Sequence, residues 1–213
     1  MSNMIKLVVF DMDGTIADTS MGILNSHRHA HKMMGSPVPQ IDVLRSVIGG
    51  PLLNSYITRF GFSPEDARTA VQYYREYYAE NGFAEAEVYE GVKETLQELK
   101  NKGCLIGVAT LKAEKFVKPM LEVLGLTQYF DIIYGMDDKD TRTKTGLIDM
   151  CVKDAGVKKE ETLMVGDSEH DMMGAQQSGV NFVGVTYGFG FRGELSDYGC
   201  QFCDKPLELL KYI

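Results

Sequence analysis

The 213 residues of the chain can form one large domain, or a domain with a smaller one inserted, and 44% of them are hydrophobic and 24% charged. This balance argues against extended disorder. The net charge of −8 argues against a nucleic-acid partner and an anionic membrane partner, because both require a basic face. A small anionic substrate remains compatible with this charge if positive charge is supplied locally.

Neither a membrane span nor a signal peptide is expected. No apolar run approaches the roughly 18 residues of a span, and residues 1–14 lack a basic start and a small-residue cleavage site. We therefore expect a cytoplasmic protein with reduced thiols. Its four cysteines are too few and too scattered for a disulfide framework. We interpret Cys200 and Cys203, a CQFC motif, as incidental because no second pair completes a zinc site.

The first predicted strand ends in two acidic residues. The apolar run IKLVV at 5–9 indicates a buried strand, and Asp11 and Asp13 follow it before Gly14. Residues i and i+2 of a strand point to the same side, so the two carboxylates would crowd like charges together. We therefore expect a cation at this position.

Residues 16 to about 84 contain helical patterns and no convincing strand. The clearest helix follows Ser63, a good N-cap, with Pro64 at its first position and Asp66 three residues after the cap. Apolar residues recur at helical spacing from there to Asn81 and Gly82.

From residue 86 onward, helices and apolar strands alternate, which indicates a parallel sheet covered on both faces. The sequence predicts helices at 92–103, 113–125, 144–156 and 170–179, strands at 104–110, 130–135, 161–167 and 181–186, and a final segment at 205–213. We expect an α/β fold with a doubly wound, Rossmann-like core (1–15 and 86–213) and an inserted α-helical cap domain (16–85). Residues 15–20 and 84–91 would connect the two.

Ligands of an open parallel sheet bind beyond the carboxyl ends of its strands. Asp167 and Asp171 follow a predicted strand there and lie four residues apart, so both can reach the space that Asp11 and Asp13 occupy. Converging carboxylates would raise one another's pKa and destabilise the fold. A hard divalent cation resolves this conflict, and oxygen ligands favour Mg²⁺.

The runs VVFDMDGTIADTS at 8–20 and GDSEHD at 166–171, with a lysine between them, resemble the haloacid dehalogenase superfamily of phosphatases. The resemblance implies that Asp11 is the nucleophile that forms an aspartyl-phosphate, and that Asp13 is the general acid and then the base. It also implies that Asp11, the Asp13 carbonyl and Asp167 hold Mg²⁺, and that Asp171 orders a metal-bound water. Dehalogenases lack the second aspartate, so Asp13 favours phosphoryl transfer.

Thr110, at the end of a predicted strand, matches the hydroxyl residue that binds phosphoryl oxygens in these enzymes. Many relatives have Asn or Ser next, whereas this chain has Leu111. We therefore expect backbone N–H groups to bind phosphate at Leu111, or Lys112 to take a different role.

A lysine is expected to offset the charge of Asp11 and of the transferring phosphate. Its position immediately before a predicted helix favours Lys144. The lysine-proline pair frequent in relatives is replaced here by Lys144-Thr145, and Lys139 and Arg142 remain alternatives.

The inserted block resembles the small helical cap of phosphoglycolate-phosphatase-like and β-phosphoglucomutase-like enzymes, which closes over the site and selects small substrates. Arg45 precedes a turn that begins at Gly49, and both resemble the substrate-facing loop of these caps. Arg75 is a weaker candidate.

Three histidines, His27, His29 and His31, raise the question of a metal site in the cap. His27 and His31 are four residues apart on a predicted helix and could both bind a metal, but a third protein ligand is not nearby. We therefore expect these histidines to form a polar face of the cap that could contact substrate. The glycine-aromatic stretch at 185–195 is expected to form a tight loop at the sheet edge, without a catalytic role.

The sequence thus predicts a Mg²⁺-dependent phosphatase for a small phosphorylated metabolite resembling phosphoglycolate. Alternatives are a 5'-nucleotidase, a pyrophosphatase, a β-phosphoglucomutase-like activity or, in a different class, a non-catalytic module that binds a phosphorylated ligand. The complete acidic and lysine set argues against the last. The sequence leaves a monomer or a homodimer open.

Overall fold

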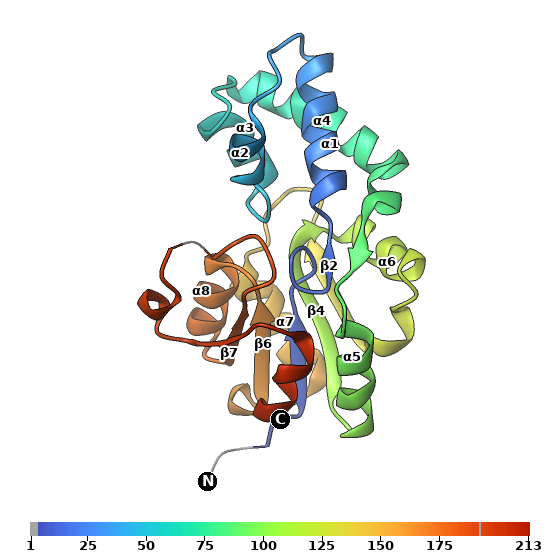
Figure 1. Cartoon of the computed structure of the whole chain (residues 1–213), viewed down its shortest axis with the longest axis vertical. Coiled ribbons are helices and arrows are strands. Elements are labelled where there is room, and N and C mark those ends of the chain that lie inside the picture. The colour runs from blue at the N-terminus through green and yellow to red at the C-terminus, as the bar shows by residue number, and fades with distance from the viewer. Residues whose placement is uncertain (1–3, 192) are drawn as a thin grey trace. The chain divides into compact units, whose positions relative to one another are not determined.

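Two units make up the computed structural model, which describes residues 4–191 and 193–213 (Figure 1). The core contains the residues up to Ala17 and from Val88 onward, and the cap contains Asp18–Glu87. These junctions lie two residues later than those expected from the sequence. The short strands β2 (Ala17–Asp18) and β3 (Glu87–Val88) pair with each other at the junctions, within the predicted connecting segments.

The core is built on a six-stranded sheet whose paired strands are all parallel, in the order β5-β4-β1-β6-β7-β8. Phe10, the last residue of β1, pairs with Val108 of β4 and Val165 of β6, so these strands approach their carboxyl ends side by side. The strands are β1 (Leu7–Phe10), β4 (Leu105–Ala113), β5 (Ile132–Met136), β6 (Thr162–Gly166), β7 (Asn181–Val185) and β8 (Gln201–Cys203).

Helices flank this sheet, which confirms the predicted α/β Rossmann-like fold class (Figure 1). They are α5 (Val92–Asn101), α6 (Glu114–Val123), α7 (Lys144–Ala155) and α8 (Glu169–Ser178), with short 3-10 turns η2 (Thr127–Tyr129), η3 (Lys159–Glu161), η4 (Leu195–Tyr198) and η5 (Pro206–Tyr212). Leu7 and Val9 of β1 pack with Leu147 and Ile148 of α7 and with Ala175 of α8 in one buried cluster. Burial of this apolar surface holds both helices against the sheet.

Two parts of the core differ from the expected elements. The strand expected at 104–110 continues to Ala113, with an irregular register against β5 between Ala109 and Ala113. The CQFC motif contributes a sixth strand, β8, in which Cys203 is fully buried. Burial raises the pKa of Cys203 to about 11, so this thiol is protonated at neutral pH. The interpretation of Cys200 and Cys203 as incidental stays a prediction.

The cap consists of helices, as the sequence predicts. They are α1 (Ser20–Met33), α2 (Ile41–Arg45), α3 (Leu52–Thr58), α4 (Pro64–Glu80) and the 3-10 turn η1 (Gly82–Glu85). The predicted start of α4 is confirmed, since the Ser63 hydroxyl accepts a hydrogen bond of 3.1 Å from the Asp66 N–H. Helix α1 packs against α4, and each helix has a face of buried residues.

The expectation of a polar histidine face is wrong for His27 and His31, which are 1% and 2% exposed. Helical spacing places both on the buried face of α1, where they pack among aromatic rings of the cap. The His27 Nδ1 lies 3.1 Å from the Tyr56 hydroxyl, and the His31 ring packs edge-on against Phe60. His29 is partly exposed and lies against the Tyr77 ring.

The stability of the cap should depend on pH through these histidines. Burial, and then the neighbouring His31, lower the pKa of His27 from 6.5 to about 3. In the unfolded chain the His27 imidazole takes up a proton near pH 6.5, whereas in the folded cap it stays neutral. The stability that the neutral His27 contributes is therefore present above pH 6.5 and is lost as the pH falls. Between pH 7 and pH 5 we expect His27 alone to reduce the free energy of unfolding by about 2 kcal/mol.

Thermal unfolding at these two pH values, compared between the wild type and His27→Phe, measures this effect. The variant should lose part of the pH dependence because phenylalanine has no proton to gain. Equal dependence in both chains would contradict the prediction.

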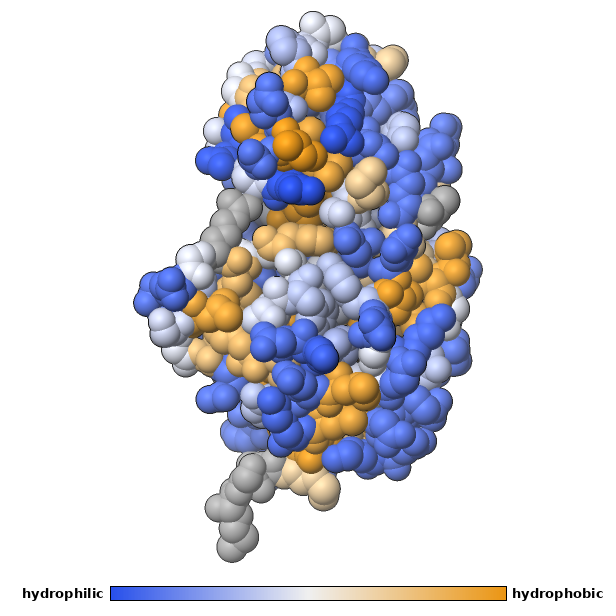
Figure 2. All heavy atoms as spheres, in the orientation of Figure 1, coloured by the Kyte–Doolittle hydropathy of each residue, from blue (hydrophilic) through white to orange (hydrophobic). Residues whose placement is uncertain are grey.

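The face in Figure 2 is mainly hydrophilic, with scattered hydrophobic areas. Large apolar side chains of the cap are exposed at Met21, Met33, Val38, Ile41 and Val43. None of the helices formed by the described residues combines the length and hydropathy of a membrane span.

Candidate active site

Asp11 and Asp167 are brought together by the adjacent strands β1 and β6. Each is the first residue after its strand, and the Asp11 N–H donates to the Val165 carbonyl over 2.9 Å. The chain turns away after Asp13 at Gly14, which has a φ of +83°. A Cβ at Gly14 would lie 2.2 Å from Asp167 Oδ2, so only glycine allows this approach.

Asp171 is oriented by the first turn of α8. Ser168 is the N-cap, and its N–H and hydroxyl donate to Asp171 Oδ2 over 3.0 and 2.6 Å. This reciprocal capping box fixes the carboxylate at the helix N-terminus, where the helix dipole favours negative charge. The other Asp171 oxygen, Oδ1, is the one that faces Lys144.

Carboxylate oxygens of Asp11, Asp167 and Asp171 lie within 4.8 Å of one another, and all three residues are buried. Burial raises the pKa of Asp11 to about 6. The charge of Lys144 acts to lower this pKa, and the charges of Asp171 and Asp13 act to raise it. Burial, then Asp171 and Asp11, also raise the pKa of Asp167 well above its usual range. The chain therefore holds these carboxylates under mutual repulsion.

Lys144 is the cation that the structure brings to this cluster. Its Nζ lies 2.6 Å from Asp11 Oδ1, 2.6 Å from Asp171 Oδ1 and 2.9 Å from the Ala109 carbonyl. Burial alone would lower the pKa of Lys144, but the two carboxylates outweigh it and raise the pKa. The ammonium is therefore charged at neutral pH.

The two alternative cations are placed elsewhere. Lys139 is exposed. Arg142 pairs with Glu114 and donates to the Gly135 carbonyl over 2.8 Å. Of the three cations weighed from the sequence, Lys144 contacts the carboxylates.

The donor set fits a divalent cation. Three carboxylates and one ammonium have a formal charge of −2, which one divalent ion balances. The donors that the side chains offer are carboxylate oxygens, the ligands that Mg²⁺ prefers.

Asp13 is paired with Lys112, a contact that the sequence did not predict. The Lys112 Nζ donates to Asp13 Oδ1 and Oδ2 over 2.8 and 3.1 Å, and both side chains are largely buried. The extension of β4 beyond Thr110 carries Lys112 to this position. Thr110 is 2% exposed, and its hydroxyl accepts the Lys112 N–H over 3.2 Å.

Leu111, Arg45 and Gly49, which the sequence predicts to bind substrate, do not belong to the acidic cluster. The Leu111 side chain packs against the apolar cluster of the core, so only its backbone is offered to a ligand. Arg45 and Gly49 are exposed residues of the cap, where Gly49 has a φ of +81°. Their role in substrate binding stays a prediction.

The loop after β7 contributes contacts that the sequence analysis missed. The N–H groups of Phe189 and Gly190 donate to Asp167 Oδ2 over 2.7 and 3.1 Å. The sequence signal was the glycine-aromatic stretch, which was expected to have no catalytic role. Backbone donors leave no side-chain signature, so the contact with Asp167 could not be deduced from the stretch.

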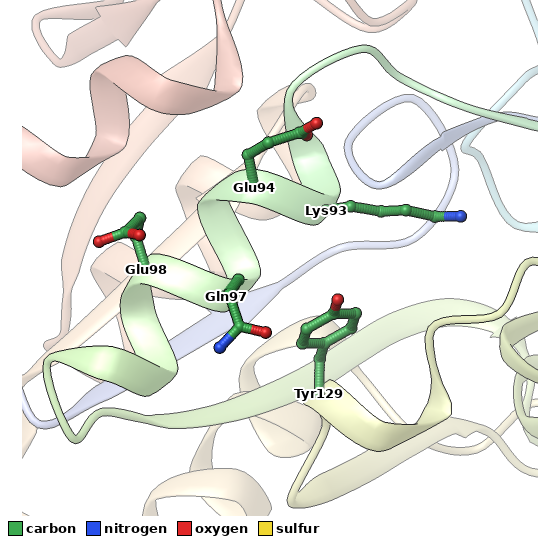
Figure 3. Close-up of a pocket in the computed structure, with 5 residues that line it drawn as sticks. All are labelled: Lys93, Glu94, Gln97, Glu98 and Tyr129. Atoms are coloured by element: carbon green, nitrogen blue, oxygen red, sulfur yellow. The ribbon is translucent and has the colours of Figure 1, made fainter.

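A separate groove lies between α5 and η2, with a volume of about 300 Å³ (Figure 3). Its lining residues are Lys93, Glu94, Gln97, Glu98 and Tyr129, none of which was predicted to act in the site.

Comparison with known proteins identifies the family. Residues 8–185 match the family described as haloacid dehalogenase-like hydrolase. The chain belongs to this family. It is 36% identical to a 5'-nucleotidase of Pseudomonas aeruginosa, over 88% of this chain and 86% of that protein. It is 30% identical to a phosphoglycolate phosphatase of Vibrio parahaemolyticus, over 98% of this chain and 96% of that protein.

The crystal structure of a predicted phosphatase from Clostridium acetobutylicum is similar, with a TM-score of 0.91 and 34% identity over 98% of both chains. These similarities confirm the resemblance noted in the sequence. The chain is a phosphoric monoester hydrolase of the haloacid dehalogenase superfamily.

Proposed function

We propose that the chain is a Mg²⁺-dependent phosphatase that hydrolyses a small phosphorylated metabolite through an aspartyl-phosphate on Asp11. The observation that carries this proposal is the contact of Asp11 with Lys144, 2.6 Å away, within the buried carboxylate cluster. A carboxylate nucleophile beside a fixed cation is suited to attack an anionic phosphoryl group.

In the first step, an Asp11 oxygen forms a bond to phosphorus and the bond from phosphorus to the leaving oxygen breaks. Asp13 gives its proton to that oxygen, so the product leaves as an alcohol. Lys144 offsets the charge of Asp11 and of the phosphoryl group, and the Thr110 hydroxyl is proposed to bind a phosphoryl oxygen. Asp11, the Asp13 carbonyl and Asp167 would hold Mg²⁺ directly, and Asp171 would do so through a water molecule; the ion would supply further positive charge to the phosphoryl group.

In the second step, water attacks the phosphorus of the aspartyl-phosphate, and the bond from phosphorus to the Asp11 oxygen breaks. Asp13 takes a proton from the water, which restores the acid for the next cycle. Phosphate and the free Asp11 carboxylate are the products. Lys112 donates to both oxygens of Asp13, which is the arrangement of an ionised carboxylate, and is proposed to hold Asp13 in place in the form that acts as base in this step.

The substrate is proposed to be a small phosphorylated metabolite resembling phosphoglycolate. The names of the similar proteins include both a phosphoglycolate phosphatase and a 5'-nucleotidase, so a nucleoside monophosphate is the second candidate. Pyrophosphate is a further candidate, because pyrophosphatases PpaX are also among the similar proteins, at 32% identity.

Phosphate release from phosphoglycolate, nucleoside monophosphates and pyrophosphate, each with Mg²⁺ or with a chelator, tests the proposal. We expect one strongly preferred substrate and a requirement for the metal. Equal release in the chelator would refute the Mg²⁺ dependence, and no release from any of these compounds would contradict the substrate class.

Arg45→Ala should weaken selection among substrates more than it slows the hydrolysis of a generic aryl phosphate. A guanidinium binds a carboxylate or a second phosphate through two hydrogen bonds, so the variant should lose about tenfold or more in kcat/KM for the preferred substrate, about 1.4 kcal/mol. Hydrolysis of a generic aryl phosphate, which lacks that second group, should remain near the wild-type rate. Arg68→Ala, another cap arginine, on α4, is the matched control. Equal losses on both substrates would show that Arg45 is structural or catalytic.

A further inference from the structure

The loop that follows β7, residues 187–190 and here called the β7 loop, contacts Asp167 through its backbone. The Phe189 N–H donates to Asp167 Oδ2 over 2.7 Å and the Gly190 N–H donates to the same oxygen over 3.1 Å. Asp167 is 4% exposed, so few water molecules could replace these donors. One oxygen of this carboxylate is therefore bound to the backbone.

Glycines allow the β7 loop to approach Asp167 this closely. A Cβ at Gly188 would lie 2.4 Å from Asp167 Cβ, from Asp167 Oδ2 and from the Gly14 carbonyl. A Cβ at Gly190 would lie 2.5 Å from Ser168 Cβ. Real Cβ atoms do not approach other heavy atoms at such distances, so any side chain at Gly188 must displace the loop or the carboxylate.

Contacts at both ends fix the β7 loop in the core. The Tyr187 hydroxyl donates to the Thr15 carbonyl over 3.2 Å, and the Tyr187 ring packs against Tyr89 with centroids 4.8 Å apart. Beyond the loop, Phe191 packs edge-on against Phe202 of β8 at 5.0 Å. The two amides are therefore held against Asp167 by packed side chains.

We propose that the β7 loop is a positioning element of the metal site, because its two amides fix the orientation in which the Asp167 carboxylate meets a divalent cation. The inference rests on the proposed function, since it assumes that Mg²⁺ binds there. Hydrogen bonds that orient a metal ligand typically change metal affinity by about 10- to 100-fold when they are lost. The β7 loop thus sets the affinity for Mg²⁺ without contacting the ion through a side chain.

The test is titration of Mg²⁺ into the full chain by isothermal calorimetry, in the wild type and in Gly188→Ala. The added methyl group forces the loop away from Asp167, so the Kd for Mg²⁺ should rise by about tenfold or more. Thermal unfolding in chelator should show a lower Tm for Gly188→Ala, because the added Cβ meets a backbone carbonyl and the Asp167 Cβ, and the titration is carried out below that Tm. The matched control is Gly107→Ala in β4, a buried glycine of the same core whose Cβ would meet ordinary contacts of 3.5 to 3.7 Å. The control should keep the wild-type Kd.

Tyr187→Phe is the second variant, and it tests the role of the β7 loop if Gly188→Ala does not fold. It removes the hydrogen bond to Thr15 without adding volume, so the Kd should rise by a smaller but measurable factor of about three. A folded Gly188→Ala chain with the wild-type Kd would overturn the inference and leave the proposed function intact, as would an unchanged Kd in Tyr187→Phe. A wild-type chain that binds no Mg²⁺ would overturn both.

Discussion

Asp11→Asn is expected to abolish phosphate release while the chain stays folded. An amide cannot form the aspartyl-phosphate, so turnover should fall by on the order of 10⁴-fold or more. The substitution keeps the shape of the side chain, and Lys144 keeps Asp171 as a partner at 2.6 Å. The measurement is phosphate release by the purified variant and wild type with the preferred substrate, alongside circular dichroism.

The same variant should be more stable than the wild type at neutral pH in chelator. Burial raises the pKa of Asp11 to about 6 although Lys144 opposes it. A carboxyl group with a raised folded-state pKa contributes stability below its unfolded pKa, and this is lost as pH rises through 6. At pH 7 the buried, ionised carboxylate should therefore destabilise the chain, and asparagine removes this charge while Lys144 keeps Asp171 as a partner.

Asp13→Asn is the matched control, because it changes the neighbouring carboxylate but leaves the nucleophile. It should keep measurable turnover of an aryl phosphate, whose leaving group needs little proton donation, and lose more with an alkyl phosphate. Turnover by Asp11→Asn at a rate near that of the wild type would refute the nucleophile assignment.

Much of the candidate site follows from strand ends that can be recognised in the sequence. Asp11 and Asp167 each come directly after a short apolar run, and parallel pairing of β1 with β6 makes those ends neighbours. Asp171 lies four residues after Asp167, at the start of α8, so its spacing alone indicated that it reaches the same space. These placements depend on local propensity and on one topological rule, which is why sequence reasoning reached them.

The remaining contacts depend on tertiary detail that no local pattern encodes. Lys112 reaches Asp13 because β4 continues past Thr110 with an irregular register, and the sequence suggested that the strand ended there. The amides of Phe189 and Gly190 are backbone groups, which every residue but proline has. His27 and His31 were misjudged because their polarity suggested a surface, whereas aromatic partners far along the chain bury them.

Lys144→Met is expected to reduce both activity and stability by large factors. The variant keeps an unbranched apolar stem but removes the ammonium that lies 2.6 Å from both Asp11 and Asp171. Without it, three buried carboxylates face one another with no lysine among them. Removing one partner of a buried ion pair typically costs about 3 to 5 kcal/mol, and losing a cation at the transferring phosphoryl group should lower kcat by about 10³-fold or more.

Mg²⁺ should restore part of the stability of Lys144→Met but little of its activity. A divalent ion replaces the missing positive charge between the carboxylates, so the loss in thermal stability should be smaller with Mg²⁺ than with chelator. Activity should remain low, because the ion does not supply the hydrogen bond that Lys144 gives to Asp11. Lys139→Met, which removes an exposed lysine five residues earlier, controls for the loss of one positive charge and should match the wild type. A Lys144→Met chain within tenfold of wild-type activity would contradict the role assigned to this ammonium, because its contacts with Asp11 and Asp171 would then serve stability alone.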